Sequence, residues 1–120
     1  MNYRQFNSFC ETMSATSHSV MWGDAHVWKV GGKVFAIGGW EKTDGPAFTF
    51  KTHEMDFEIL KTERGYRPAP YMASRGMKWI QMYDVGGNED DLRYYLTESY
   101  RLVAGGLSKK KRAQLGIELD

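Results

Sequence analysis

Apolar side chains recur at helical spacing at the start of the chain, with polar residues between them. The apolar positions are Tyr3, Phe6, Cys10 and Met13. This periodicity predicts an amphipathic helix over residues 2–15. Because Cys10 lies on the apolar face, a buried structural thiol is favoured over a nucleophile, which needs an exposed electropositive environment.

The periodicity changes between His18 and Lys51, where short runs of β-branched and aromatic residues are separated by glycine or aspartate. A tight hairpin is expected at Gly31-Gly32, and Thr43-Asp44-Gly45 indicates a longer turn. We therefore predict an antiparallel meander with strands over 20–22, 26–30, 34–38 and 47–51.

The last of these strands has two distinct faces. Phe48 and Phe50 share one face, whereas Thr49 and Lys51 share the other. In an antiparallel sheet this alternation predicts that the phenylalanine face is packed and the other face is wet.

A short helix is expected after this strand, from an N-cap at Thr52 to about Glu63. Glu54 suits its first turn, and Met55, Ile59 and Leu60 are expected to face inward.

The stretch 65–83 follows that helix and contains Pro68 and Pro70. Proline restricts the residue before it to extended conformations and donates no hydrogen bond. We expect a stiff, extended connector here and then a strand over 77–83. The stretch carries Arg67, Arg75 and Lys78, with no acidic residue.

Two helices are predicted in the remainder of the chain. Asn88 and the three carboxylates after it complement the positive end of a helix, which the pair Gly105-Gly106 ends. Its inward positions are expected to be Leu92, Leu96, Ser99, Leu102 and Val103. Ser108 then caps a last helix, 109–115, that we expect to pack little.

Composition adds constraints on the class of protein. A chain of 120 residues, 42% hydrophobic and 26% charged, predicts a single domain over residues 1–120. One cysteine excludes an intramolecular disulfide, and neither a signal peptide nor an apolar run of membrane-spanning length is seen. We expect a cytoplasmic protein without a membrane partner, and a monomer is favoured over an oligomer.

Charge is informative through its distribution rather than through the total of +1. The run Lys109, Lys110, Lys111 and Arg112 stands at a helix start, where cations oppose the dipole. It is either a solvated face or a set of phosphate contacts. Basic residues before it could join the run in one surface, with aromatic rings available for stacking. The basic residues are Arg64, Arg67, Arg75 and Lys78, and the rings are those of Tyr66, Tyr71 and Trp79.

Catalytic and metal chemistry find little support. His18, His26 and His53 show no paired ligand spacing, and no nucleophile elbow or phosphate-binding glycine motif is present. We therefore expect no enzyme activity, no metal and no cofactor.

Several motifs in this order resemble the MmcQ/YjbR family of small bacterial proteins, and the resemblance covers nearly the whole chain. They are the glycine-linked hairpin, the Lys51-Thr52 boundary, the segment Arg67-Pro68-Ala69-Pro70-Tyr71-Met72, Trp79, and a final helix with Asp91-Leu92 and Ser99-Tyr100. The proline segment followed by a tryptophan strand is the most specific part.

The resemblance implies an α+β fold of the CyaY-like type, with an antiparallel sheet packed against helices. It also implies DNA binding through a proposed double-wing arrangement, with Lys51, Arg67, Arg75 and Lys78 as contacts. The related frataxin fold suggests iron binding through an acidic first helix, but the first helix here offers only Glu11, which disfavours iron.

Two functions remain open from the sequence. The first is a nonenzymatic DNA-binding protein that contacts phosphates through the basic residues in and after the proline segment. The alternative is a protein-binding or small-ligand-binding module with an aromatic pocket around Tyr71 and Trp79, which the low net charge favours.

Overall fold

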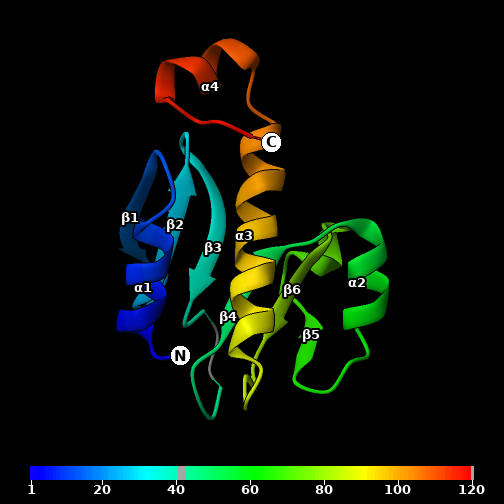
Figure 1. The fold of residues 1–120 in the computed structure, drawn as a ribbon. Coiled ribbons are helices and arrows are strands. Elements are labelled where there is room, and N and C mark those ends of the chain that lie inside the picture. Colours follow the sequence, from blue (N-terminus) through cyan, green and yellow to red (C-terminus); the bar gives the residue numbers. More distant parts are fainter. Residues whose placement is uncertain (41–42, 120) are drawn as a thin grey trace.

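A six-stranded antiparallel sheet in the order β1-β2-β3-β4-β6-β5 organises the protein (Figure 1). The computed structural model describes residues 1–40 and 43–119. The strands are β1 (Thr16–Met21), β2 (Ala25–Val30), β3 (Lys33–Gly38), β4 (Phe48–Lys51), β5 (Tyr66–Pro68) and β6 (Trp79–Met82). The helices are α1 (Tyr3–Glu11), α2 (Glu54–Leu60), α3 (Glu89–Gly105), α4 (Lys109–Leu115) and the 3-10 helix η1 (Ala73–Arg75). This confirms the α+β class and the antiparallel sheet.

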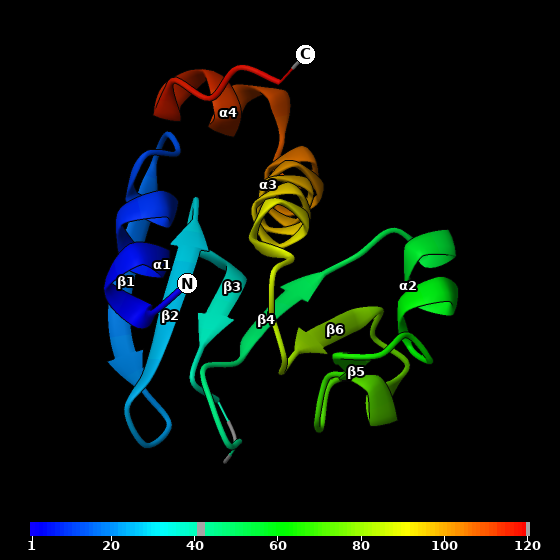
Figure 2. The same cartoon turned by 60° about the horizontal axis from the view of Figure 1, so that its bottom comes forward.

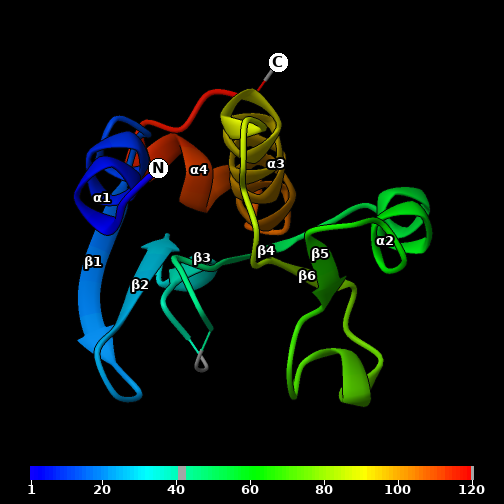
Figure 3. The same ribbon diagram turned by 90° about the horizontal axis from the view of Figure 1, so that it is seen from below.

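The two faces of the sheet are covered differently. Helices α1, α3 and α4 lie on one side, whereas the β1–β2 turn and the segment that carries η1 project from the other (Figures 2 and 3). Helix α2 stands beside the β5–β6 edge (Figure 1). We call the two sides the helix-covered face and the loop-covered face.

The meander β1–β4 is confirmed, and its tight turn depends on two glycines. Gly31 and Gly32 have φ angles of 56° and 83°, which are favourable only for glycine. Strand β1 begins at Thr16, earlier than expected, because its residues 16–19 are polar and lie at the sheet edge, where apolar periodicity is weak.

The main core lies between the sheet and the helices. Phe6 of α1 packs on Phe48 of β4 with ring centroids 5.1 Å apart, and both side chains are fully buried. Ser99 of α3 connects three elements, since its hydroxyl donates to the Phe35 carbonyl oxygen at 2.6 Å and accepts from the Lys51 amide at 2.9 Å. The apolar core is therefore pinned by one buried polar residue.

Helix α2 differs from the expectation. It begins after an N-cap at His53 rather than at Thr52, whose hydroxyl donates to the Lys78 carbonyl instead. Met55 and Ile59 are 76% and 57% exposed, so their predicted inward orientation is wrong. The reason is position: a two-turn helix at the sheet edge buries only one narrow face, which carries Phe57 and Leu60.

The wet face predicted beside Thr49 is also wrong, because Thr49 is fully buried. Residues distant in sequence fold beneath the sheet there and form a second core. The second core comprises Ala25, Val27 and Ile37, with Met21, Val34, Trp40 and Met72 packed against them. The proline segment contributes to this cover through Met72, and its first residues form the edge strand β5 rather than a free connector.

The two C-terminal helices match their predictions closely. Asn88 is the N-cap of α3, although its side chain makes no capping bond, and the Ser108 hydroxyl accepts from the Lys111 amide at 3.0 Å. Helix α4 packs more than expected, since Leu115 joins the main core and lies close to Gly31. None of the helices in the described ranges combines the length and hydrophobicity needed to cross a membrane.

Candidate functional site

Three loops bring one aromatic side chain each to the loop-covered face. Trp22 comes from the β1–β2 turn, Trp40 follows β3, and Tyr71 follows β5. The ring centroid of Trp40 lies 5.8 Å from that of Trp22 and 5.8 Å from that of Tyr71. We call these three rings the aromatic stripe. Trp22 and Tyr71 are 51% and 65% exposed, so the stripe offers ring surface to a partner.

Backbone strain accompanies both exposed ends of the stripe. Trp22 and Tyr71 have φ angles of 49° and 66°, a left-handed conformation that costs a residue with a side chain about 1 kcal/mol or more. The turn at Tyr71 is held by its carbonyl oxygen, which accepts from the Ser74 hydroxyl at 2.6 Å. Ala15 and Asp24 share this conformation outside the stripe, with φ angles of 61° and 72°. Strain of this kind is frequent at recognition sites, because stability alone would not select it.

Arg67 is fixed next to the stripe by a chain of hydrogen bonds. Its Nε donates to Oε1 of Gln81 at 2.8 Å, and Nε2 of Gln81 donates to the Trp40 carbonyl oxygen at 2.8 Å. The Arg67 guanidinium also lies over the Tyr83 ring, 5.7 Å from its centroid. Because Gln81 is fully buried, this Arg67 clamp is rigid at its base. The two terminal nitrogens of a guanidinium that is held through Nε suit a bidentate anion.

A second buried polar side chain lies beside the Arg67 clamp. The register pairs Gln81 with both Arg67 and Thr49, so the three side chains share one face. Within the part of the chain that the structure describes, the Thr49 hydroxyl has no hydrogen-bond partner. A buried unpaired hydroxyl is destabilising, and here it lies under the cover formed by the loops.

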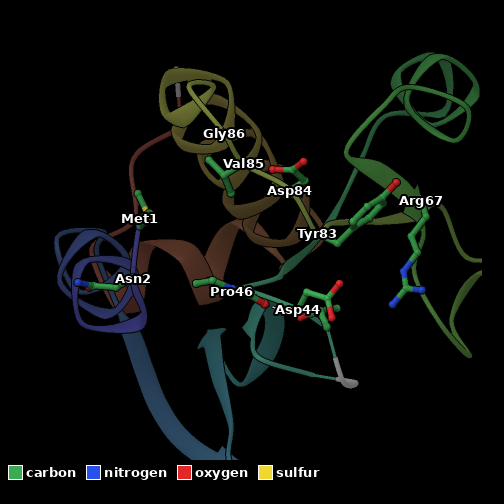
Figure 4. A pocket seen from close by; sticks show the side chains of 11 residues that line it. Met1, Asn2, Asp44, Pro46, Arg67, Tyr83, Asp84, Val85 and Gly86 are labelled. Atoms are coloured by element: carbon green, nitrogen blue, oxygen red, sulfur yellow. Dashed lines mark hydrogen bonds between the residues drawn. The ribbon is translucent and has the colours of Figure 1, made fainter.

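A hollow of about 1030 Å³ opens at the other side of Arg67 (Figure 4). Figure 4 shows Arg67 and Asp44 pointing into the same space below Tyr83. The lining residues are Met1, Asn2, Thr43, Asp44, Gly45, Pro46, Arg67, Tyr83, Asp84, Val85 and Gly86. Arg67 therefore joins the aromatic stripe to a hollow of mixed charge.

The strands of the loop-covered face carry only basic charges among the described residues. Lys29 lies two positions beyond Val27 on β2, Lys51 lies two positions beyond Thr49 on β4, and Arg67 is on β5. Side chains two residues apart on a strand share a face. Lys51 and Arg67, both predicted from the sequence, thus lie on one face, joined by Lys29, which was not predicted.

The other predicted basic residues lie elsewhere. Lys78 places its amine 4.9 Å from the Phe57 ring centroid, toward α2. Arg75 is the exception, since it is exposed on η1, whose segment projects from the loop-covered face (Figure 3). Helix α4, which carries the basic run 109–112, stands at the opposite end of the molecule from β5 and η1 (Figures 1 and 2). Lys109, Lys110 and Lys111 therefore do not share one surface with Arg67.

Arg112 has a structural role in the last turn of α3. One of its terminal nitrogens donates to the carbonyl oxygens of Leu107 at 2.6 Å and Gly105 at 3.1 Å, and at 3.4 Å to that of Ala104. A cation at the C-terminal end of a helix satisfies carbonyls that have no partner within the helix. This contact joins α4 to α3.

Nucleophilic and metal chemistry find no centre in residues 1–40 and 43–119. Cys10 is buried, and burial raises the pKa of its thiol, which keeps it protonated and inert. No cluster of three His, Cys, Asp or Glu side chains converges in those ranges. The structure does bring His18 and His26 together, with Nε2 of one 3.1 Å from Nδ1 of the other.

Sequence reasoning missed Trp22, Trp40 and Gln81 as site residues. The available signal was a large aromatic residue beside glycine at the end of a strand, as in Trp22-Gly23 and Gly39-Trp40. Gln81 gave no such signal, because its role depends on the strand register.

The comparisons with known proteins agree with this fold. A family model described as YjbR matches residues 11–102. The chain belongs to the YjbR family. Of the curated proteins, none matches it. Membership in YjbR confirms the resemblance drawn from the proline segment, and YjbR is not known as an enzyme family.

Two solved structures are similar to this YjbR protein. A Deinococcus radiodurans protein with a domain described as DUF419 has a TM-score of 0.83 and 21% identity, over 98% of this chain and 89% of that one. A Pseudomonas syringae protein has a TM-score of 0.68 and 18% identity, over 86% of this chain and 99% of that one. At these identities the two structures support the fold.

Proposed function

We propose that this YjbR protein is a nonenzymatic, cytoplasmic nucleic-acid-binding protein that holds phosphates on its loop-covered face. The observation that carries the proposal is the Arg67 clamp. A buried glutamine orients the guanidinium, so little side-chain entropy is lost when an anion binds. Arginine in a fixed orientation suits the planar, two-oxygen recognition of a phosphate.

The charges of the surrounding strands support the same surface. Lys29 and Lys51 stand on strands two apart, about 10 Å from each other at the usual strand spacing. With Arg67 they give three cations on one face, and Arg75 on the exposed η1 extends them. Asp44 and Asp84 line the same hollow as Arg67 and oppose phosphate inside it, so in this proposal the nucleic-acid strand reaches Arg67 from the side of Lys51.

Lys78 and the α4 lysines remain candidate contacts for a longer nucleic acid that reaches beyond this face. They are secondary in the proposal, because they lie toward α2 and at the far end of the molecule.

The test is a salt titration of binding to generic DNA. We expect affinity to fall as salt rises, because bound cations release counterions from the phosphates. Arg67→Ala should weaken binding to all sequences alike and reduce the magnitude of the salt slope by about one. Arg101→Ala is the matched control, since this exposed arginine lies on α3, on the helix-covered face.

Two results would contradict the proposal. One is an absence of binding at low salt. The other is an equal loss for Arg67→Ala and Arg101→Ala, which would indicate a general effect of charge.

The alternative of an aromatic pocket around Tyr71 and Trp79 receives less support. Tyr71 is 65% exposed and Trp79 is 5% exposed. Neither residue lines the hollow beside Arg67. The hollow itself suits a ligand that carries both a negative and a positive group, facing Arg67 and Asp44 respectively.

A further inference from the structure

We propose that the aromatic stripe binds the unpaired bases of a single-stranded nucleic acid, while Lys29, Lys51 and Arg67 bind its phosphates. The inference rests on the proposed function and specifies its substrate: a single strand, recognised largely without regard to sequence.

The first argument is the exposed ring surface. Proteins that bind single strands stack successive bases on aromatic side chains, because every base has a flat π-face. Trp22, Trp40 and Tyr71 form a continuous row with centroid spacings of 5.8 Å, and both ends of the row are more than half exposed. A row of this length accommodates two or three bases.

The second argument is the position of charge relative to the stripe. The Arg67 clamp ends on the backbone carbonyl of Trp40, so the same buried side chain binds the guanidinium and the backbone of the central residue of the stripe. Lys29 and Lys51 lie on the same face of the sheet, toward the ends of β2 and β4 that are distant from Trp22 and Trp40, so a bound strand would run along this face from the rings to the lysines. Bases on the rings and phosphates on the cations are the two halves of a single-strand site.

The third argument is preorganisation. The left-handed backbone at Trp22 and Tyr71 is maintained at a cost in stability, and it keeps both rings on the surface. Trp40 is anchored in the second core with Met72, so the centre of the stripe is fixed. Rings that are already in place lose little entropy on binding.

A duplex cannot use this stripe in the same way. Its bases are stacked on each other, and their faces become accessible only when they are unpaired or flipped out. The stripe would therefore add affinity for single strands alone, whereas the cations would serve both forms.

The experiment compares probes that differ in their bases. The full chain is titrated at one salt concentration with three fluorescent probes: a short oligothymidylate, an abasic strand of equal length and backbone, and a duplex. We expect the oligothymidylate to bind at least tenfold more tightly than the abasic strand, because stacking on one ring contributes that much.

Matched variants then assign the difference to the rings. Tyr71→Ala should weaken oligothymidylate binding about tenfold and leave abasic binding unchanged, whereas Tyr71→Phe, which keeps the ring, should bind as the parent does. Trp22→Ala, in a different loop, is an independent second variant with the same expected result. Circular dichroism confirms that each variant is folded.

The outcomes separate the inference from the proposed function. Equal affinity for the oligothymidylate and the abasic strand, or an equal loss for both probes in Tyr71→Ala, overturns base stacking while phosphate binding stands. If none of the three probes binds at low salt, both proposals are overturned.

Discussion

The two faces of the sheet differ in how completely their side chains are packed and hydrogen-bonded. On the helix-covered face, α1 and α3 enclose fully buried aromatic side chains such as Phe6, Phe35 and Phe48, and the polar Ser99 there is completely hydrogen-bonded. On the loop-covered face, a smaller core lies beside the Thr49 hydroxyl, which has no hydrogen-bond partner among the described residues, and is bordered by strained residues at Trp22 and Tyr71. The contrast indicates that one face provides stability and the other holds a recognition surface at some cost.

The largest expected effect concerns the helix-covered face. Phe48→Ala should lower the free energy of unfolding by about 3–5 kcal/mol, because the buried ring contacts both Phe6 and Tyr3. Ile37→Val in the second core should cost only about 1 kcal/mol. Urea denaturation measures both. Equal losses at the two positions would contradict the division of roles between the faces.

Gln81→Leu tests the base of the Arg67 clamp. The change removes two hydrogen bonds and leaves the Trp40 carbonyl without its donor, so stability should fall by about 1–3 kcal/mol. Nucleic-acid affinity should fall with it, since Arg67 is no longer oriented. Full affinity in a destabilised Gln81→Leu protein would show that the orientation of Arg67 is irrelevant to binding.

Thr49→Val, at the position paired with Gln81 on the neighbouring strand, should have the opposite effect on stability. The substitution replaces a buried hydroxyl that has no hydrogen-bond partner in residues 1–40 and 43–119 with a methyl group of similar shape, and we expect a gain of roughly 1 kcal/mol in the free energy of unfolding. Urea denaturation of this variant beside Gln81→Leu gives the sign directly. A loss of stability would mean that the hydroxyl has a partner in solution.

Strain at the end of the stripe is measurable by a pair of variants. Tyr71→Gly should be more stable than Tyr71→Ala by about 1 kcal/mol, because glycine adopts the φ of 66° without a Cβ penalty. Thermal unfolding of both proteins provides the comparison. An alanine variant as stable as the glycine variant would remove the argument from strain.

The smallest expected effect is a pH dependence at the β1–β2 ribbon. Desolvation, and then the charge of the neighbouring His26, lower the pKa of His18 below 6.5, and Glu11 opposes this shift. The unfolded chain then takes up a proton at higher pH than the folded protein does. The neutral His18 therefore contributes to the free energy of unfolding. This contribution is complete above pH 6.5 and is lost as the pH falls through the lowered folded-state pKa.

This dependence is checked by urea denaturation at pH of about 7.5 and about 5.5, values that bracket the ordinary histidine pKa. His18→Gln should lose less stability on acidification than the parent protein. An identical decline in both proteins would assign the effect to other groups.

Much of the fold was predictable because its signals are local. Capping by Ser108 placed α4 correctly, and Gly31-Gly32 placed the hairpin. The proline segment identified the family. In each case the deciding interactions lie within a few residues of one another.

The loop-covered face was not predictable in this way. Thr49 is fully buried on the face where Trp40 and Met72, from separate loops, pack against the second core, and Gln81 meets Arg67 only through the β5–β6 register. Arg67 and Lys51 were found as single basic residues, but their common face with Lys29 depends on the order of strands in the sheet. Exposed Met55 and Ile59 show the same limit, since periodicity alone does not reveal which helices lie at an edge.

The most direct test of the central claim is the response of the four tryptophan indole N–H signals to a short oligothymidylate, followed by nitrogen-15 NMR. Trp22 and Trp40 lie in the aromatic stripe, whereas Trp28 lies on the helix-covered face with its indole donating to Asn7 at 2.8 Å, which makes it an internal control. The account predicts that the Trp22 and Trp40 signals shift on binding and the Trp28 signal does not. Saturable binding that shifts Trp28 and leaves Trp22 and Trp40 in place would contradict it.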